Sequence, residues 1–398
     1  MTPPAMIWGA MATENKDKAR TTSGEEVVSP NTPSAMNTTP INLGHIEVLQ
    51  ILNEHGEVDA GLDPNFDDDT LLKVYRAMVL ARAFDHRMIT MQRQGRMGTF
   101  APNMGQEACI IGQVQPLTSD DWFAPSYRSF GAQIMRGWSM EHLMRLWAGF
   151  HDGFPPPEGV NDLPFSIVIG SHVLPAVGVG MGMNYRNQKN CVVVNFGDGA
   201  SSQGSVSEAL NFAAVSNAPV VFVCENNGWA ISTPIEKQSA NEILAVRGMS
   251  YGIPSIRVDG NDILAMICAT KEAVRRAKSG GGPTYIEAVT YRMSLHTTAD
   301  DPTVYRDEKE VEPWEVRCPI TRFETYLTNK ELLDAASIAG IRESCEQDAF
   351  NARDAFYEMP PADPEEIFDH LYEVFPEELG IQRQEYLDRL RNKGLDNE

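Results

Sequence analysis

Mostly hydrophobic runs alternate with helix-like segments in the centre of the chain. Residues 191–196 and 220–224 form two such runs, which are typical of strands buried on both faces of a sheet. The segment between them, 204–217, repeats apolar residues at helical spacing, and Pro219 separates it from the second run. Its predicted buried face consists of Val206, Ala209, Leu210 and Ala213.

The same alternation continues towards the C-terminus. A short strand is predicted at 255–258, a helix at 262–278 and a further strand at 283–290. Strands that alternate with helices predict an α/β fold, with a largely parallel sheet flanked by helices on both faces. Ligands of such sheets bind beyond the carboxyl ends of the strands, so residues directly after each strand are the first candidates for a site.

Changes in composition divide the rest of the chain. Residues 1–40 are rich in Ser, Thr, Pro and Ala without an apolar period, which predicts a disordered N-terminal arm. A central domain is expected at 41–318, with an extended lead-in followed by a helix at 71–92. Residues 319–398 are charged and helix-like, and we expect them to form a helical C-terminal layer.

Charge and cysteine content narrow the class of protein. The 398 residues include 55 acidic and 33 basic side chains, a formal net charge of −22, which disfavours nucleic acid and anionic membranes as partners. The six cysteines lack metal-ligand spacing, so we expect buried thiols in a reducing compartment. No apolar run reaches the ~18–20 residues of a membrane span. We expect a cytoplasmic protein, with the mitochondrial matrix as the alternative.

Two short motifs follow the two central strands. They read Gly197-Asp198-Gly199-Ala200 and Glu225-Asn226-Asn227-Gly228. Asn227 lies 29 positions after Asp198, so a carboxylate and an amide reach neighbouring strand ends beside a glycine turn. Hard oxygen ligands together with phosphate oxygens suit magnesium, and a turn that opens a helix offers N–H groups to a diphosphate. Taken singly, Asp198 is an ordinary turn residue and Asn227 a strand-end cap; the metal interpretation rests on their combination.

Eight ordered blocks of sequence surround these motifs. They lie at 94–96, 105–107, 126–128, 167–170, 197–204, 225–233, 258–260 and 291–306. With these blocks, the chain resembles the alpha subunit of the decarboxylating component of 2-oxo acid dehydrogenase complexes, across roughly residues 45–390. The resemblance implies the thiamine diphosphate-binding fold, with thiamine diphosphate and magnesium as cofactors.

The resemblance also implies how the cofactor is held. In the family, magnesium is bound by Asp198, by the side chain of Asn227 and by the backbone carbonyl of Trp229. Tyr127 and Arg128 match a pair that reaches the phosphates, for which Arg is a suitable clamp. Without the other blocks, Arg128 would be taken for a surface arginine beside a packed aromatic. The remaining cofactor-binding positions are Gly197, Gly199, Ala200, Ala230, Ile167 and Ile169.

Five positions carry further expectations. Ile167 and Ile169 match residues whose backbone flanks the aminopyrimidine, and the same run also reads as a buried strand. His296 matches the family histidine near the reacting centre, which contacts phosphate and assists proton or acyl transfer; it is the predicted catalytic residue. For His172 we expect a supporting polar role rather than catalysis. Thr297 stands where mitochondrial relatives carry a phosphorylatable serine.

The implied activity is decarboxylation of a small 2-oxo acid and transfer of the acyl group to a lipoyl arm on an acyltransferase partner. The glutamate that activates the cofactor comes from a separate beta subunit in the family, which predicts a heterotetramer of two alpha and two beta subunits. Residues 157–164 resemble pyruvate-type chains, whereas 228–234 and 258–262 resemble the branched-chain type equally well. We favour pyruvate.

Other functions stay open at this point. A branched-chain 2-oxo acid or acetoin dehydrogenase is the alternative within the family. A non-catalytic subunit that keeps the fold would have been favoured by loss of Asp198, Asn227 or His296, and all three are present. A nucleotide-binding oxidoreductase would need a GxGxxG turn after the first strand, and no convincing match occurs.

Overall fold

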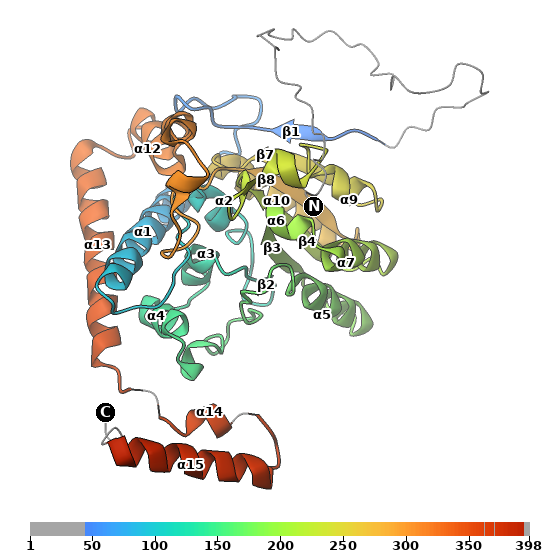
Figure 1. Cartoon of the computed structure of the whole chain (residues 1–398). Helices are drawn as coiled ribbons and strands as arrows, with labels where there is room; N and C mark the ends of the chain where they lie inside the picture. Colours follow the sequence, from blue (N-terminus) through green and yellow to red (C-terminus); the bar gives the residue numbers. More distant parts are fainter. Residues whose placement is uncertain (1–43, 362, 370, 394–398) are drawn as a thin grey trace, which may run out of the picture. The chain divides into compact units, whose positions relative to one another are not determined.

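The computed structural model describes residues 44–361, 363–369 and 371–393 (Figure 1). The predicted arm at 1–40 lies outside the described residues. A six-stranded sheet occupies the centre, with the order β1-β7-β8-β4-β3-β2 and every neighbouring pair parallel. Its strands are β1 (Glu47–Leu49), β2 (Trp122–Ala124), β3 (Val192–Gly197), β4 (Val220–Asn226), β7 (Ser255–Asp259) and β8 (Thr284–Val289). The predicted parallel α/β architecture is confirmed.

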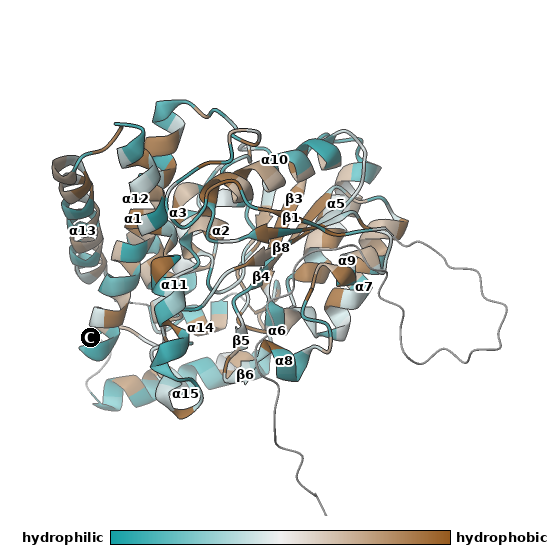
Figure 2. Ribbon diagram, turned by 90° about the horizontal axis from the view of Figure 1, so that it is seen from above, coloured by the Kyte–Doolittle hydropathy of each residue, from teal (hydrophilic) through white to brown (hydrophobic). Residues whose placement is uncertain are grey.

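Two layers of helices cover the sheet. The first contains α10 (Ile263–Lys278) and α2 (Glu107–Gly112), behind which lie α1 (Asp68–Arg93), α12 (Pro319–Asn329) and α13 (Ala335–Glu358). The second contains α5 (Val173–Tyr185) and α7 (Gly204–Val215). The strands lie between these helices in both views, and in Figure 2 they are among the most hydrophobic parts of the ribbon.

Shorter elements connect these layers. The helices among them are α3 (Phe130–Met135), α4 (Met140–Ala148), α6 (Asp198–Ser201), α8 (Ile235–Gln238), α9 (Val246–Met249), α11 (Glu312–Val316), α14 (Glu366–Asp369) and α15 (Glu377–Lys393). A small hairpin joins β5 (Trp229–Ala230) to β6 (Thr233–Pro234). Three 3₁₀ turns, η1 (His151–Gly153), η2 (Pro302–Val304) and η3 (Glu308–Glu310), complete the described elements.

The burial pattern explains why β3 and β4 read as unbroken apolar runs. Val193, Val221 and Val223 pack towards α1, α2 and α10, whereas Val192 and Val194 pack towards α5 and α7. A strand covered on both faces has no solvent side, so no alternation of polar residues develops. The core on the α1, α2 and α10 side of the sheet also includes residues of α12 and α13, among them Phe323, Leu327 and Cys345.

The first helix begins where its sequence predicts. The Asp67 carboxylate caps it by accepting a hydrogen bond from the Thr70 N–H at 2.7 Å, and Asp68 and Asp69 follow in the first turn. Its buried stripe runs from Leu71 to Met91. This confirms the predicted helix at 71–92.

All six cysteines are free thiols, and five of them are buried. This confirms the expected packing role of the thiols. Among the described residues, no helix is both long enough and apolar enough to cross a membrane.

Asp262 ties the N-terminal segment to the sheet layer. Its fully buried carboxylate accepts the backbone N–H groups of Ile51 and Leu52, both at 2.6 Å, and caps α10 through Leu264 and Ala265. Four backbone donors inside the core thus depend on one side chain.

We expect Asp262→Ala to lower the free energy of unfolding by about 3–5 kcal/mol, because buried backbone donors lose their acceptor and α10 loses its cap. The control is Asp334→Ala at the exposed cap of α13, which should cost about 1 kcal/mol. Urea unfolding of the full-length chain measures both, and equal losses would contradict the role assigned to Asp262.

Candidate functional site

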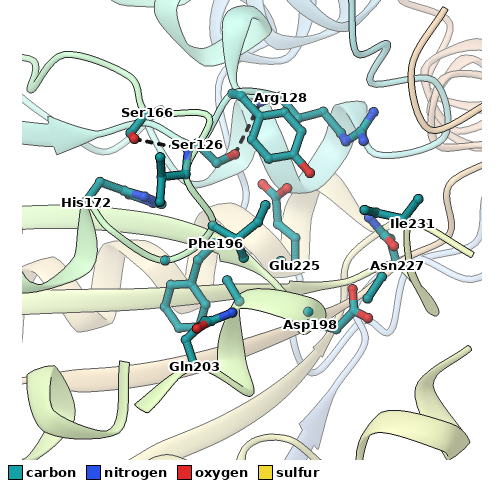
Figure 3. Close-up of a pocket in the computed structure, with 18 of the residues that line it drawn as sticks. Ser126, Arg128, Ser166, His172, Phe196, Asp198, Gln203, Glu225, Asn227 and Ile231 are labelled. Atoms are coloured by element: carbon teal, nitrogen blue, oxygen red, sulfur yellow. Dashed lines mark hydrogen bonds between the residues drawn. The ribbon is translucent and has the colours of Figure 1, made fainter. Parts of the chain in front are cut away.

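A cavity of about 230 Å³ opens beyond the carboxyl ends of β3 and β4. Five separate segments of the chain line it, and Figure 3 shows side chains from these segments converging on it. The predicted site residues in its wall are Tyr127, Arg128, Ile169, Gly197, Asp198, Gly199, Ala200, Asn227, Trp229, Ala230 and His296. Ile167 is the one predicted cofactor-binding residue that does not line this cavity.

Asp198 and Asn227 meet at the lower edge of the cavity (Figure 3). Gly197 pairs with Glu225 in the sheet, so the residues that follow β3 and those at the end of β4 come close together. Burial raises the pKa of the Asp198 carboxyl, and hydrogen bonds from the Gln238 side chain and the Asn227 backbone N–H oppose that rise. A buried carboxylate that is costly to ionise is a suitable ligand for a divalent cation.

The side chain of Asn227 is held in one orientation. Its Nδ2 donates to Gln106 Oε1 at 2.9 Å, and its Oδ1 accepts the Trp229 N–H at 3.2 Å. Gln238 Nε2 donates to Asp198 Oδ2 at 2.5 Å. The donor set beside the cavity therefore contains one carboxylate and one amide oxygen, which are hard ligands of the kind that magnesium takes.

No cluster of three or more His, Cys, Asp or Glu side chains with metal-binding geometry occurs in the described part of the chain. The predicted magnesium set needs only one such side chain, Asp198. The magnesium site therefore stays a prediction.

The glycine turn at 197–200, which spans the junction of β3 and α6, makes a close contact with the β5 hairpin. A Cβ atom at Gly199 would lie 2.8 Å from the Cβ of Ala230, so no larger residue fits there without displacing Ala230. This packing brings the backbone of the turn and the hairpin to the same wall of the cavity.

His296 lies between two arginines at the opposite wall. Its Nδ1 is 3.2 Å from Arg128 Nη2 and 3.2 Å from Arg292 Nη1. A guanidinium can only donate, so Nδ1 must be the acceptor and the proton of the neutral ring sits on Nε2. Burial, Arg128 and Arg292 lower the pKa of His296 to about 3. The ring therefore enters the site as a neutral hydrogen-bond donor.

The loop that carries His296 is tied down by its own side chains. Asp300 Oδ2 accepts the His296 N–H at 2.8 Å and the Tyr305 hydroxyl at 2.5 Å. Arg292 Nη2 donates to the same hydroxyl and to the carbonyl of Ile231, both at 2.8 Å. The loop flanked by Arg292 and Tyr305 is thus joined directly to the β5 hairpin.

Ile231 has a left-handed backbone, with φ of 56°. This conformation is rare for a β-branched residue and costs roughly 1–2 kcal/mol. Arg292 binds its carbonyl and so helps to hold it. Sequence reasoning missed this strained residue, because the run around Ile231 carries no turn signal of its own.

The predicted buried strand at residues 167–169 is wrong. These residues form an exposed turn before α5 rather than a buried strand, and their exposed fractions are 65%, 70% and 38%. Gly170 adopts a left-handed φ of 76°, and Ser171 Oγ donates to the Val168 carbonyl, so the chain turns instead of extending. Directly before this turn, Ser166 forms an isolated bridge to Ser126.

His172 is buried at the start of α5 and lines the cavity. Its Nε2 donates to the Asn195 carbonyl at 2.6 Å, and burial lowers its pKa. The expected supporting role stays a prediction. Ser126, Gln203 and Glu225 also line the wall; each lies inside a block that matches the family, but none was predicted as a site residue.

In the cofactor-free chain, we expect His296 to stay neutral between pH 5 and 8, since its pKa is lowered to about 3. Nitrogen chemical shifts of the His296 ring, followed across this pH range, measure this. Arg292→Met removes one of the two facing cations and should raise the pKa of His296 by one unit or more. A wild-type His296 that titrates near pH 6.5 would refute the neutral state assigned to it.

Sequence comparison connects this geometry to known proteins. The family model for the dehydrogenase E1 component matches residues 75–364. A pyruvate dehydrogenase E1 component subunit alpha from Acholeplasma laidlawii is 42% identical over 339 residues, which cover 83% of this chain and 96% of the relative. A 3-methyl-2-oxobutanoate dehydrogenase subunit alpha from Mycobacterium tuberculosis is 40% identical, covering 85% and 93%, and a pyruvate dehydrogenase alpha subunit from Bacillus cereus is 38% identical, covering 86% and 93%. The chain belongs to the dehydrogenase E1 component family.

Proposed function

We propose that this chain is the alpha subunit of a pyruvate dehydrogenase that decarboxylates pyruvate on thiamine diphosphate and passes the acetyl group to a lipoyl acyltransferase. One observation carries the proposal. Asp198, Asn227, Arg128 and His296, which come from four distant parts of the chain, line a single cavity at the carboxyl edge of the sheet. The family match and the similarity to pyruvate-type relatives support it.

Two parts of the cavity wall fit the cofactor. Asp198, Asn227 and the Trp229 carbonyl would hold magnesium, and the glycine turn at 197–200 would offer its N–H groups to the diphosphate. Arg128 and Tyr127 would contact the phosphates from the other side. Positive charge from Arg128 and nearby Arg292 suits a ligand of several negative charges.

Bound thiamine diphosphate would supply the electron sink for decarboxylation. The chain itself would contribute placement and charge. His296 would present its Nε2 proton to an oxygen of the cofactor or substrate, because Arg128 and Arg292 occupy its Nδ1 side. Asp198 and the buried wall would exclude water from the metal, which strengthens each electrostatic contact there.

The mouth of the cavity favours a protein partner. Ile167, Val168, Ile169 and Ile231 are 65%, 70%, 38% and 53% exposed beside or within the wall. Clustered apolar side chains at a cavity mouth are typical of an interface. We assign this rim to a beta subunit in a heterotetramer of two alpha and two beta subunits, in which the beta subunit completes the site and the acyltransferase core receives the acyl group.

A branched-chain 2-oxo acid is the second candidate substrate. The alpha subunit from Mycobacterium tuberculosis that is named for 3-methyl-2-oxobutanoate is nearly as similar as the pyruvate relative, at 40% against 42% identity. A hydrophobic pocket separates such substrates by only ~1–3 kcal/mol for each methylene. Substrate choice therefore needs a direct assay.

The alpha chain should be inactive alone and active after coexpression with its beta subunit. We expect turnover to need both magnesium and thiamine diphosphate, with kcat/KM highest for pyruvate among pyruvate, 2-oxoisovalerate and acetoin. Reduction of an artificial electron acceptor measures turnover of each of the three substrates. Asp198→Ala should remove the response to magnesium while the heterotetramer still assembles, since Asp198 is the only carboxylate in the predicted ligand set.

Two results would defeat the proposal. One is decarboxylation by the purified alpha chain without a partner. The other is a correctly assembled complex that turns over none of the three substrates.

Thr297 follows His296 at the cavity, so a charge there should act on the bound diphosphate. We expect Thr297→Glu to lower the activity of the complex at least about 100-fold, because the added carboxylate would repel the diphosphate. Thr297→Gln, of similar size without charge, is the control. Circular dichroism should show both variants folded, and unchanged turnover in Thr297→Glu would remove phosphorylation of Thr297 as a candidate for control.

A further inference from the structure

We propose that Asn195 is the positioning residue for the phosphate-binding segment Ser126–Arg128, and that Glu225 fixes the orientation of its amide. The inference rests on the proposed function for the identity of the ligand. It assigns a role to Asn195 in β3, which belongs to no motif, and to Glu225 in β4, which opens the second motif but was given no role there.

Asn195 and Glu225 are polar residues in an otherwise apolar layer. Both lie on the sheet face that also carries Val193, Val221 and Val223, and their exposed fractions are 0% and 3%. Burial of a carboxylate and an amide is costly unless each is fully hydrogen-bonded. Such a pair is expected only where the contacts it makes serve something beyond packing.

The side-chain oxygen of Asn195 contacts a single segment, 126–129. Its Oδ1 accepts the Ser126 N–H at 2.8 Å and the Ser129 hydroxyl at 2.7 Å. Its Nδ2 donates to Glu225 Oε1 at 2.5 Å, and Gln113 Nε2 donates to the same oxygen at 3.0 Å. Because two amide N–H groups converge on Glu225 Oε1, that oxygen is an acceptor, and it holds the NH₂ of Asn195 towards itself and the amide oxygen of Asn195 towards Ser126.

The segment held in this way carries the phosphate clamp. Ser126 Oγ lies 3.0 Å from Ser129 Oγ, which closes a tight turn around Tyr127 and Arg128. From that turn, Arg128 reaches His296 and the cavity. Figure 3 shows the Glu225 carboxyl group between Asp198 below and the Ser126–Arg128 side above.

The pair therefore connects the two halves of the site. Asn195 lies on β3, three residues before Asp198, and Glu225 lies on β4, two residues before Asn227. Hydrogen bonds from Asn195 fix the distance between the strands that carry the predicted metal ligands and the segment that carries Arg128. A diphosphate bridging metal and arginine needs that distance to be correct before it binds.

Exchanging the hydrogen-bond donor and acceptor between positions 195 and 225 tests this role. Asn195→Asp places a carboxylate oxygen against Glu225 Oε1, and we expect the Kd for thiamine diphosphate at saturating magnesium to rise about tenfold or more. Glu225→Gln keeps an oxygen for both amides and should raise Kd only about threefold. In the double variant, the new amide at position 225 would donate to the new carboxylate at position 195, and Gln113 could rotate its own amide to accept. Kd should then return to within about threefold of wild type.

The measurement is titration of the assembled heterotetramer with thiamine diphosphate, followed by kcat at saturating cofactor. A positioning role predicts a change in Kd with kcat within about twofold of wild type. Asn351→Asp on the exposed face of α13 is the matched control for the amide-to-carboxylate change. Its Kd should equal that of wild type.

The outcomes separate this inference from the proposed function. If the wild-type heterotetramer fails to bind thiamine diphosphate, the proposed function is wrong. If wild type binds and Asn195→Asp binds equally well, Asn195 positions nothing. If the double variant is no better than Asn195→Asp although both melt at the same temperature, the orientation role of Glu225 is wrong.

Discussion

Parallel pairing of β3 with β4 is the constraint on which the rest of the site depends. Because α7 connects the two strands as a crossover, both end at the same edge of the sheet, and Gly197 comes opposite Glu225. Asp198 and Asn227 are neighbours for this reason alone, although 29 residues separate them. The segments that carry Arg128 and His296 follow β2 and β8, which pair with β3 and β4, and side-chain hydrogen bonds then fix these segments at this edge.

Local sequence was sufficient for the inner strands and the long helices. β3, β4, β7, β8, α1, α7 and α10 have a periodicity or an apolar run of their own, and each was predicted close to its observed bounds. The edge strands β1 and β2 have three residues each, and they exist only because a longer neighbour pairs with them. No window of sequence contains that information.

The residues of the site also fall into two groups, those that the sequence predicted and those that it did not. Asp198 and Asn227 were found because they follow strands, and Tyr127, Arg128 and His296 because whole blocks resemble a family. Asn195 was overlooked because it lies inside a hydrophobic run, and Glu225 was predicted only as the first residue of a motif, without a role of its own. Residues 167–169 misled for the opposite reason: apolar side chains were taken as buried, yet they remain exposed beside the cavity mouth.

The two arginines that flank His296 have a consequence for the order of events in the pocket. While the pocket lacks an anion, their charges repel a proton from the imidazole ring. An arriving diphosphate offsets that repulsion, so the ring becomes more basic only once the ligand is seated. The pKa of His296 would then be higher in the ligand-bound protein than in the free protein. The histidine would become able to exchange a proton only after the ligand has bound.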